Sequence, residues 1–400
     1  MRMSSHAKRW ISRLIKLAFC GGALWYLSGK VTLNDYARLA ENPAKKYLLI
    51  RRDAQMLELE DPDTGKRTTV PYSALATREK NRREIEPGLK SIFRSADHSW
   101  SLWGLLLYGP VTFLISWRLQ LMLATQDIPL KYRDATLLTF AGNFFNFAMP
   151  GTTGGDLYKA YHIAQRTHKR TEGVTIVLLD RAIGLASFLI LGAITILISW
   201  KKDMIGEYGR WVGYLMVAFM IGTALFFSRR FRRWISYDAL LARLPFADKL
   251  RRIDQTTFSF RRHRGQALLS LAITLVAHFL FVGSIYAMAR ALGIHPHDDQ
   301  TAGDLFLAIL LAAVVGYLFA AIPITIQGFG LLEAVFIRVL VNGGWCNESQ
   351  MLALTLSARL IQMAWSLPGI AVPWLGFSRP HTDDMEAATT DSSPASELAS

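Results

Sequence analysis

The sequence contains little of what enzyme active sites and disulfide-stabilised folds are built from. Its 400 residues include only two cysteines, Cys20 and Cys346, which lie far apart in or beside apolar segments. They provide neither a disulfide framework nor the spacing of a metal site. The sequence also has no histidine-based catalytic constellation, no aspartate-rich metal motif and no glycine-rich nucleotide loop. We therefore expect no cofactor and no bound metal, and we do not expect an enzyme.

Acidic residues are fewer than basic ones: 31 Asp and Glu stand against 45 Lys and Arg, which gives a net charge of +14. Such an excess can indicate a nucleic acid partner, but here the basic residues lie between apolar segments, where they set membrane topology. We expect no nucleic acid partner. The densest basic cluster, residues 229–264, predicts a cytoplasmic loop that lies either along the inner leaflet or in solvent.

Apolar residues make up 51% of the chain, and several runs approach the roughly 20 residues that cross a bilayer. The mean hydropathy of +0.22 is high for a soluble protein of this size. The predicted fold class is an all-α integral membrane protein, a polytopic helix bundle. Arg118 is expected at the cytoplasmic face, directly after the second span. Full spans are predicted at residues 10–28, 100–117, 173–200, 211–227, 266–291 and 351–375.

Composition divides the chain into a first membrane helix (1–30) with a cytoplasmic N-terminus, an extramembrane insertion (31–98), a transmembrane domain (99–376) and a disordered polar tail (377–400). The small insertion carries dense charges of both signs, and we place it on the side opposite the N-terminus. Short strands are predicted at 47–51, 56–60 and 67–71, with a Pro/Asp/Gly turn between the last two. Residues 77–94 are interpreted as a charged helix or linker.

Two apolar segments are interrupted in the same way. Residues 143–159 contain a break at Pro150, and residues 321–333 contain one at Pro323; threonine, glycines and an acid follow each proline. Such breaks free backbone groups that hydrocarbon cannot satisfy, and broken helices mark binding sites in transporters. We predict two re-entrant segments in an inverted repeat, the first entering from the cytoplasm and the second from outside. Ordinary loops, or a full span at 305–322, are the alternatives.

Charged residues lie within the apolar segments, where an unpaired charge costs about 3 kcal/mol or more. Asp180 and Arg181 are adjacent on a predicted helix, so they point about 100° apart and each must find its partner elsewhere. The basic residues could hold a phosphate, and the acids could balance them or hold a cationic headgroup or a proton. The alternative is a set of ion pairs that only fixes helix packing. The set comprises Lys159, Arg181 and Arg359 with Asp156, Asp180 and Glu333. Backbone N–H groups after Gly155 and Gly330 are also expected to suit anions.

These motifs together resemble the lysylphosphatidylglycerol synthase transmembrane (flippase-like) family. The resemblance covers residues 100–376 and the first helix. It rests on an asparagine-rich segment with Pro-Gly-x-x-Gly-Gly-Asp-x-x-Lys, an acid–arginine pair one helix later, Pro-x-x-x-x-Gly-x-Gly-x-x-Glu, and an arginine in the final helix. The substrate-binding residues that it implies are Asn143, Pro150, Gly155, Asp156, Lys159, Asp180, Arg181, Gly328, Gly330, Glu333 and Arg359.

The chain departs from this family in three respects. Lys159 and Asp180 stand where arginine and glutamate are expected, the insertion 31–98 is not part of the family's short first loop, and the sequence shows no soluble aminoacyl-transferase domain. Synthase activity is therefore not expected.

The resemblance implies a flippase that moves a phospholipid or lipid-linked headgroup across the cytoplasmic (inner) membrane of a prokaryote. Its partner is then that membrane lipid. Two alternatives stay open. One is an intramembrane transferase that modifies a lipid, although His278 is a lone histidine within a span and more typical of packing. The other is an accessory subunit whose insertion, 31–98, docks an envelope protein partner.

Overall fold

The computed structural model describes most of the insertion and of the helical bundle. The described residues are 32–53, 55–78, 82–83, 85–148, 154–199, 263–296, 300–321 and 328–372, with a few single residues between 213 and 233. Outside them lie the predicted span 10–28, most of the predicted span 211–227, most of the basic loop 229–264, the tail 377–400, Pro150 and Pro323.

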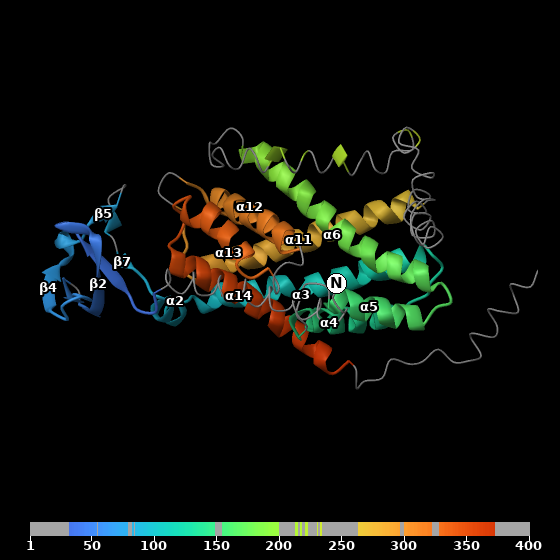
Figure 1. Cartoon of the computed structure of the whole chain (residues 1–400), viewed down its shortest axis with the longest axis horizontal. Coiled ribbons are helices and arrows are strands. Elements are labelled where there is room, and N and C mark those ends of the chain that lie inside the picture. Colours follow the sequence, from blue (N-terminus) through green and yellow to red (C-terminus); the bar gives the residue numbers. More distant parts are fainter. Residues whose placement is uncertain are drawn as a thin grey trace, which may run out of the picture.

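The helices form a bundle along the long axis of the molecule, and the strands form a separate unit at one end (Figure 1). The largest apolar core joins α3, α11, α12 and α14, with Ile285, Leu305 and Ile309 among its buried side chains. The described helices are α2 (Leu89–Arg94), α3 (His98–Ala124), α4 (Tyr132–Ala148), α5 (Gly154–Gln165), α6 (Arg170–Ser199), α11 (Arg264–Ala291), α12 (Ala302–Ala320), α13 (Leu331–Phe336), the π-helix η3 (Ile337–Val341), α14 (Glu348–Ser366) and the 3-10 turn η4 (Leu367–Ile370).

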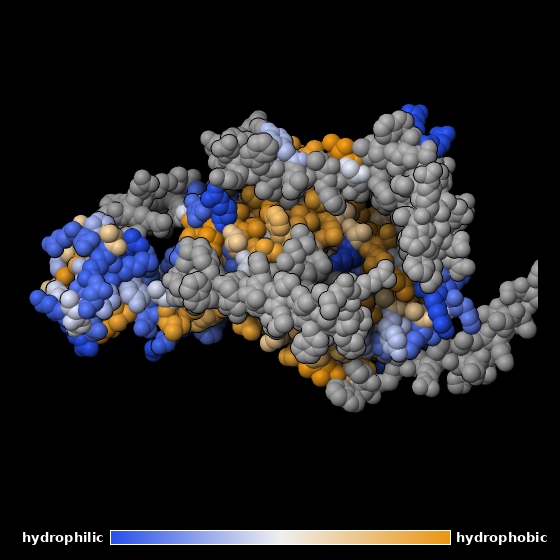
Figure 2. Space-filling model, in the orientation of Figure 1, coloured by the Kyte–Doolittle hydropathy of each residue, from blue (hydrophilic) through white to orange (hydrophobic). Residues whose placement is uncertain are grey.

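Four of the described helices, α3, α6, α11 and α12, are long and apolar enough to cross a membrane. Large hydrophobic side chains point outward from these helices, among them Trp103, Leu178, Leu197 and Phe279. So much exposed apolar surface is unfavourable in water and suits contact with lipid. The surface shows a hydrophobic middle between more hydrophilic ends (Figure 2). The chain is therefore a helical integral membrane protein.

The predicted spans 100–117, 173–200 and 266–291 correspond to α3, α6 and α11. The segment before the second break is α12, whose 19 residues make it long enough to cross by itself. The predicted span 351–375 corresponds to α14 and η4, and α14 is not among the helices that meet the length and hydropathy of a span.

The insertion folds into a five-stranded antiparallel sheet in the order β4-β3-β2-β1-β7. In β3, Leu57 and Leu59 are buried while Glu58 and Glu60 alternate with them, as expected of a strand with one apolar face. The strands of the insertion are β1 (Tyr36–Leu39), β2 (Asn42–Arg52), β3 (Met56–Glu60), β4 (Arg67–Pro71) and β7 (Ile85–Glu86), with a small pair, β5 (Thr77–Arg78) and β6 (Arg82–Arg83).

The prediction of a charged helix or linker for residues 77–94 was wrong over its first part. Strands β5, β6 and β7 lie within residues 77–86, and helix begins only at Leu89. The physical reason is tertiary: Ile85 in β7 pairs with Ala37 of β1 and packs against the buried apolar side of the sheet. Pairing of this kind overrides the weak helix propensity of a charged stretch.

The sheet is joined to the bundle near the start of α14. The backbone N–H and the hydroxyl group of Thr32 lie 3.4 Å and 3.3 Å from the hydroxyl oxygen of Ser349. On the other side of the joint, the Leu89 N–H donates to the Thr32 carbonyl oxygen at 2.9 Å, and the Gly88 N–H donates to the Asp35 carboxylate at 2.7 Å. Thr32 thus connects the first residues of α2 to α14.

Candidate functional site

The first break is held by a very close approach of α4 and α5. A Cβ on Gly155 would lie 2.0 Å from the carbonyl oxygen of Gly142, so only glycine fits at this crossing. The side chain of Asn146 accepts a hydrogen bond of 2.8 Å from the Gly155 N–H. The end of α4 therefore caps the beginning of α5 and satisfies one of the N–H groups that a helix start leaves open.

The second break uses left-handed backbone and an internal carboxylate. Gly328 and Gly330 have φ angles of 71° and 86°, a region that side chains other than glycine rarely adopt. A Cβ at Gly328 would also lie 2.3 Å from the Ala320 side chain. Glu333 then accepts a hydrogen bond of 2.7 Å from the Gly330 N–H at the start of α13.

The backbone N–H groups of Gly155 and Gly330 themselves have internal acceptors, Asn146 and Glu333 respectively. The expectation that the N–H groups after these two glycines suit anions concerns the residues that follow them, and it stays a prediction.

An arginine connects the two breaks. Arg181 in α6 forms an ion pair of 2.7 Å with Asp156, which lies in the first turn of α5. A second nitrogen of the same guanidinium donates a 3.0 Å hydrogen bond to the carbonyl oxygen of Ala321, at the end of α12. That carbonyl is one of those that a helix end leaves without an intrahelical donor. The beginning of α5 and the end of α12 therefore meet at one side chain.

A second ion pair lies beside the second break. The Glu333 side chain, 1% exposed, accepts a 2.9 Å hydrogen bond from Arg359 of α14, whose side chain is 12% exposed. The Arg359 guanidinium carbon also lies 3.9 Å from the centre of the Phe329 ring, a cation–π contact. Glu333 thus holds both the start of α13 and the arginine of the neighbouring helix.

A third pair, Asp180 with Arg118, is the most deeply buried. Their side chains are 7% and 4% exposed, the closest nitrogen and oxygen are 2.7 Å apart, and Arg118 also donates to the Thr274 hydroxyl at 2.8 Å. The prediction that adjacent Asp180 and Arg181 have separate partners is confirmed. The placement of Arg118 at the cytoplasmic face was wrong, because α3 continues for six residues beyond it, to Ala124.

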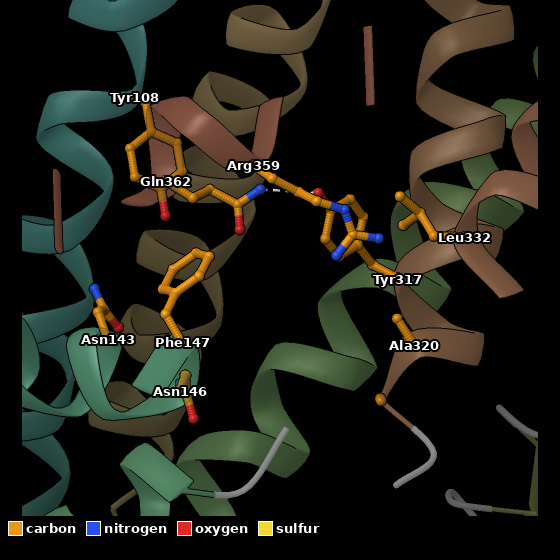
Figure 3. Close-up of a pocket in the computed structure, with 10 residues that line it drawn as sticks. Tyr108, Asn143, Asn146, Phe147, Tyr317, Ala320, Leu332, Arg359 and Gln362 are labelled. Atoms are coloured by element: carbon orange, nitrogen blue, oxygen red, sulfur yellow. Dashed lines mark hydrogen bonds between the residues drawn. The ribbon is translucent and has the colours of Figure 1, made fainter. Parts of the chain in front are cut away.

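A cavity of about 250 Å³ lies between the two breaks (Figure 3). Its lining comes from α3, α4, α12, α13 and α14, and Arg359 and Gln362 of α14 both reach into it in the close-up. Gln362 donates a 2.9 Å hydrogen bond to the Tyr317 hydroxyl oxygen. The described residues around it are Tyr108, Asn143, Asn146, Phe147, Tyr317, Ala320, Ala321, Leu332, Arg359 and Gln362.

Of the predicted site residues, Asn143 and Arg359 line this cavity directly. Lys159 is buried, its side chain crosses the face of Gly142, and it has no ion-pair or hydrogen-bond partner among the described residues. Pro150 lies outside the described residues. The predicted members that do not line the cavity are Gly155, Asp156, Lys159, Asp180, Arg181, Gly328, Gly330 and Glu333.

Several polar residues of the site were not predicted from the sequence: Tyr108, Asn146, Tyr317, Gln362 and the buried Arg118. Helical spacing was an available signal for two of these. Asn146 follows Asn143 by three residues and Gln362 follows Arg359 by three residues, which places each pair on one helix face. The tyrosines carried no such signal, because aromatic residues are common throughout this chain.

The arrangement combines internal charge pairs with a polar space. Arginine recognises phosphate well because its planar guanidinium can donate two parallel hydrogen bonds. Amides and phenols can hydrogen-bond neutral groups. In the part of the chain that the structure describes, no group of three or more His, Cys, Asp or Glu side chains is placed to hold a metal ion.

Comparison with protein families gives one match. Residues 88–369 match the family model described as the lysylphosphatidylglycerol synthase TM region. The match covers more than half of the chain, includes both breaks and all three charge pairs, and excludes the strands of the insertion. No curated protein matches the chain at a significant level.

Proposed function

Since the chain belongs to the lysylphosphatidylglycerol synthase TM region family, we propose that it is a flippase that moves a phospholipid or lipid-linked headgroup across the cytoplasmic membrane of a prokaryote. The family indicates a role connected with membrane lipids. The observation that carries the finer proposal is the cavity between the two breaks, which places an arginine and neutral polar groups inside an apolar bundle. Charged and polar groups at such a place are energetically costly in a membrane, so their presence there supports a functional role.

The directions of the broken segments support a repeat of opposite orientation. In Figure 1, α4 and α5 run between the middle of the bundle and the end away from the sheet, whereas α12 and α13 run between the middle and the end next to the sheet. We propose that these are two re-entrant segments of an inverted repeat. Such pairs suit alternating access to a central site.

The charge distribution supports an orientation. The end away from the sheet carries the basic residues Lys131, Arg133, Arg166, Lys169, Arg170 and Arg264 near the ends of its helices. By the positive-inside rule we assign this end to the cytoplasm. The sheet then lies outside the cytoplasm, and a first span at 10–28 puts the N-terminus in the cytoplasm.

The mechanism that we propose is an exchange of partners. A phosphate entering the cavity replaces Glu333 as the partner of Arg359, and then replaces Asp156 and the Ala321 carbonyl as partners of Arg181. Each arginine keeps an oxygen partner throughout the exchange, and Glu333 keeps the Gly330 N–H as a hydrogen-bond donor. Release of Arg181 also separates the two breaks, because it is the side chain that connects them.

The experiment is lipid movement in proteoliposomes. Dithionite added outside the vesicles quenches the fluorescent phospholipid of the outer leaflet only. Movement across the bilayer then appears as loss of the fluorescence that the inner leaflet protects. We expect Arg181→Ala and Glu333→Ala to abolish movement while the purified protein keeps its elution volume and tryptophan emission. Arg51→Ala, which removes an exposed arginine of the sheet, is the matched control.

The same assay separates transport from the alternative of a lipid-modifying transferase. Movement in vesicles without any donor substrate supports the flippase, since a transferase needs a donor. Normal movement by both site variants contradicts the proposed mechanism, and wild-type protein that moves no lipid contradicts the proposed function.

A further inference from the structure

The lining of the cavity also selects the kind of headgroup, provided that the proposed function holds. We propose that the headgroup is a hydroxylated one, a glycerol or sugar attached through a phosphodiester, rather than a cationic amine. Three features of the cavity lead to this inference: hydrogen-bonding groups that await a partner, the absence of a lining acid among the described residues, and its volume.

Two polar side chains of the lining have unused hydrogen-bonding capacity. The Tyr108 hydroxyl and the Asn143 amide face the cavity, and neither makes a hydrogen bond to another described residue. Both residues are half-buried, and polar groups that face an enclosed space usually bind protein, water or a ligand. A phenol can donate and accept, and an amide offers two donors and an acceptor. Hydroxyl groups of a ligand match both, because a hydroxyl also donates and accepts.

The charges around the cavity disfavour a cationic headgroup. Arg359 is the charged side chain among the described lining residues, and no carboxylate lines the cavity there. The nearest acid of the second break, Glu333, is 1% exposed, and its two oxygens accept hydrogen bonds from Arg359 and the Gly330 N–H. An ammonium group that enters the cavity while Glu333 is paired with Arg359 therefore meets a guanidinium and no carboxylate of the described lining, which is unfavourable in a low-dielectric site.

The volume limits how much of the lipid enters. At about 250 Å³ the cavity lies just below the roughly 300–1,000 Å³ of sites that enclose drug-sized ligands. The described space has room for a phosphate with a glycerol or a single sugar ring. We propose that the acyl chains stay in the bilayer while the headgroup passes.

The test compares two labelled lipids of equal charge in the proteoliposome assay. Phosphatidylglycerol and phosphatidylpropanol are both monoanionic phosphodiesters with three-carbon headgroups, but only the first carries hydroxyl groups. We expect wild-type protein to move phosphatidylglycerol faster. Tyr108→Phe and Asn143→Leu should each lower the ratio of the two rates by about two- to tenfold, the value of one neutral hydrogen bond. Both variants should leave the rate of phosphatidylpropanol nearly unchanged.

Tyr132→Phe is the matched control, because the Tyr132 hydroxyl donates to the Phe113 carbonyl oxygen outside the cavity lining. It should leave the ratio unchanged. Equal wild-type rates for the two lipids overturn the inference and leave the flippase proposal standing, as does faster movement of lysylphosphatidylglycerol than of phosphatidylglycerol. Failure to move any of the three lipids overturns the flippase proposal itself. If one cavity variant fails to fold, the other still decides the outcome.

Discussion

Replacing Arg118 with methionine removes one charge of the most deeply buried ion pair and keeps most of the side chain's length. The change leaves the carboxylate of Asp180, 7% exposed, without the guanidinium 2.7 Å away. Thr274 loses its contact with Arg118 but still donates to the carbonyl oxygen of Ser270 at 2.6 Å, so the main damage is electrostatic.

The expected cost follows from this burial. Removing one partner of a buried pair typically destabilises a protein by about 3–5 kcal/mol, because an uncompensated charge stays behind. Replacing both partners with apolar residues of similar volume is often neutral. We therefore expect Arg118→Met to lower the free energy of unfolding by about 3–5 kcal/mol, and the double variant Arg118→Met with Asp180→Leu to return to within about 1 kcal/mol of wild type.

The assay is unfolding by SDS in mixed micelles, followed by the emission of the 11 tryptophans. A matched comparison is Arg181→Met, whose pair with Asp156 is 25% exposed on both sides and should cost roughly 1 kcal/mol. The reasoning is refuted if Arg118→Met unfolds like wild type, because the pair would then be solvated. It is also refuted if the double variant is no more stable than the single one.

Two further predictions concern backbone approach and thiol burial. Gly155→Ala should destabilise the α4–α5 pair by about 1–3 kcal/mol in the same SDS assay, because its Cβ would lie 2.0 Å from a carbonyl oxygen. Gly265→Ala is the control and should not change stability, because the space around Gly265 is open. Equal stability of the two variants would contradict the close approach of α4 and α5 at Gly155. Burial raises the pKa of the Cys346 thiol from 9.0 to about 12. In a Cys20→Ser variant at pH 8 we expect maleimide to label the Cys346 thiol only after unfolding, and rapid labelling of the folded protein would contradict its burial. The free energy of unfolding should fall above about pH 9, because the thiol ionises in the unfolded protein before it ionises in the folded one.

The charge pattern made part of the site predictable from sequence. Asp180 and Arg181 had to diverge because adjacent helical residues point about 100° apart, and the structure gives them the separate partners Arg118 and Asp156. The proline and glycine pattern likewise located the ends of α4 and α12 and the starts of α5 and α13. These inferences use local geometry, which a sequence states directly.

The features that sequence did not reveal depend on contacts between distant segments. Arg118 looks like a helix-end residue until α3 is seen to continue and Asp180 to lie beside it. The cavity needs Tyr108 and Tyr317 to face one another across helices that are more than 200 residues apart in the chain. Strand β7 depends on its pairing with β1, which local propensity cannot show.

The hydrogen bonds between Thr32 and Ser349 give the sheet a mechanical connection to the cavity. Ser349 lies at the start of α14 and Arg359 is ten residues further along the same helix, roughly 15 Å at 1.5 Å per residue. A helix of this length is stiff, so a displacement of the sheet can be transmitted along α14 to the arginine that lines the cavity. A molecule bound to the sheet would in that way act on a charge in the interior of the bundle.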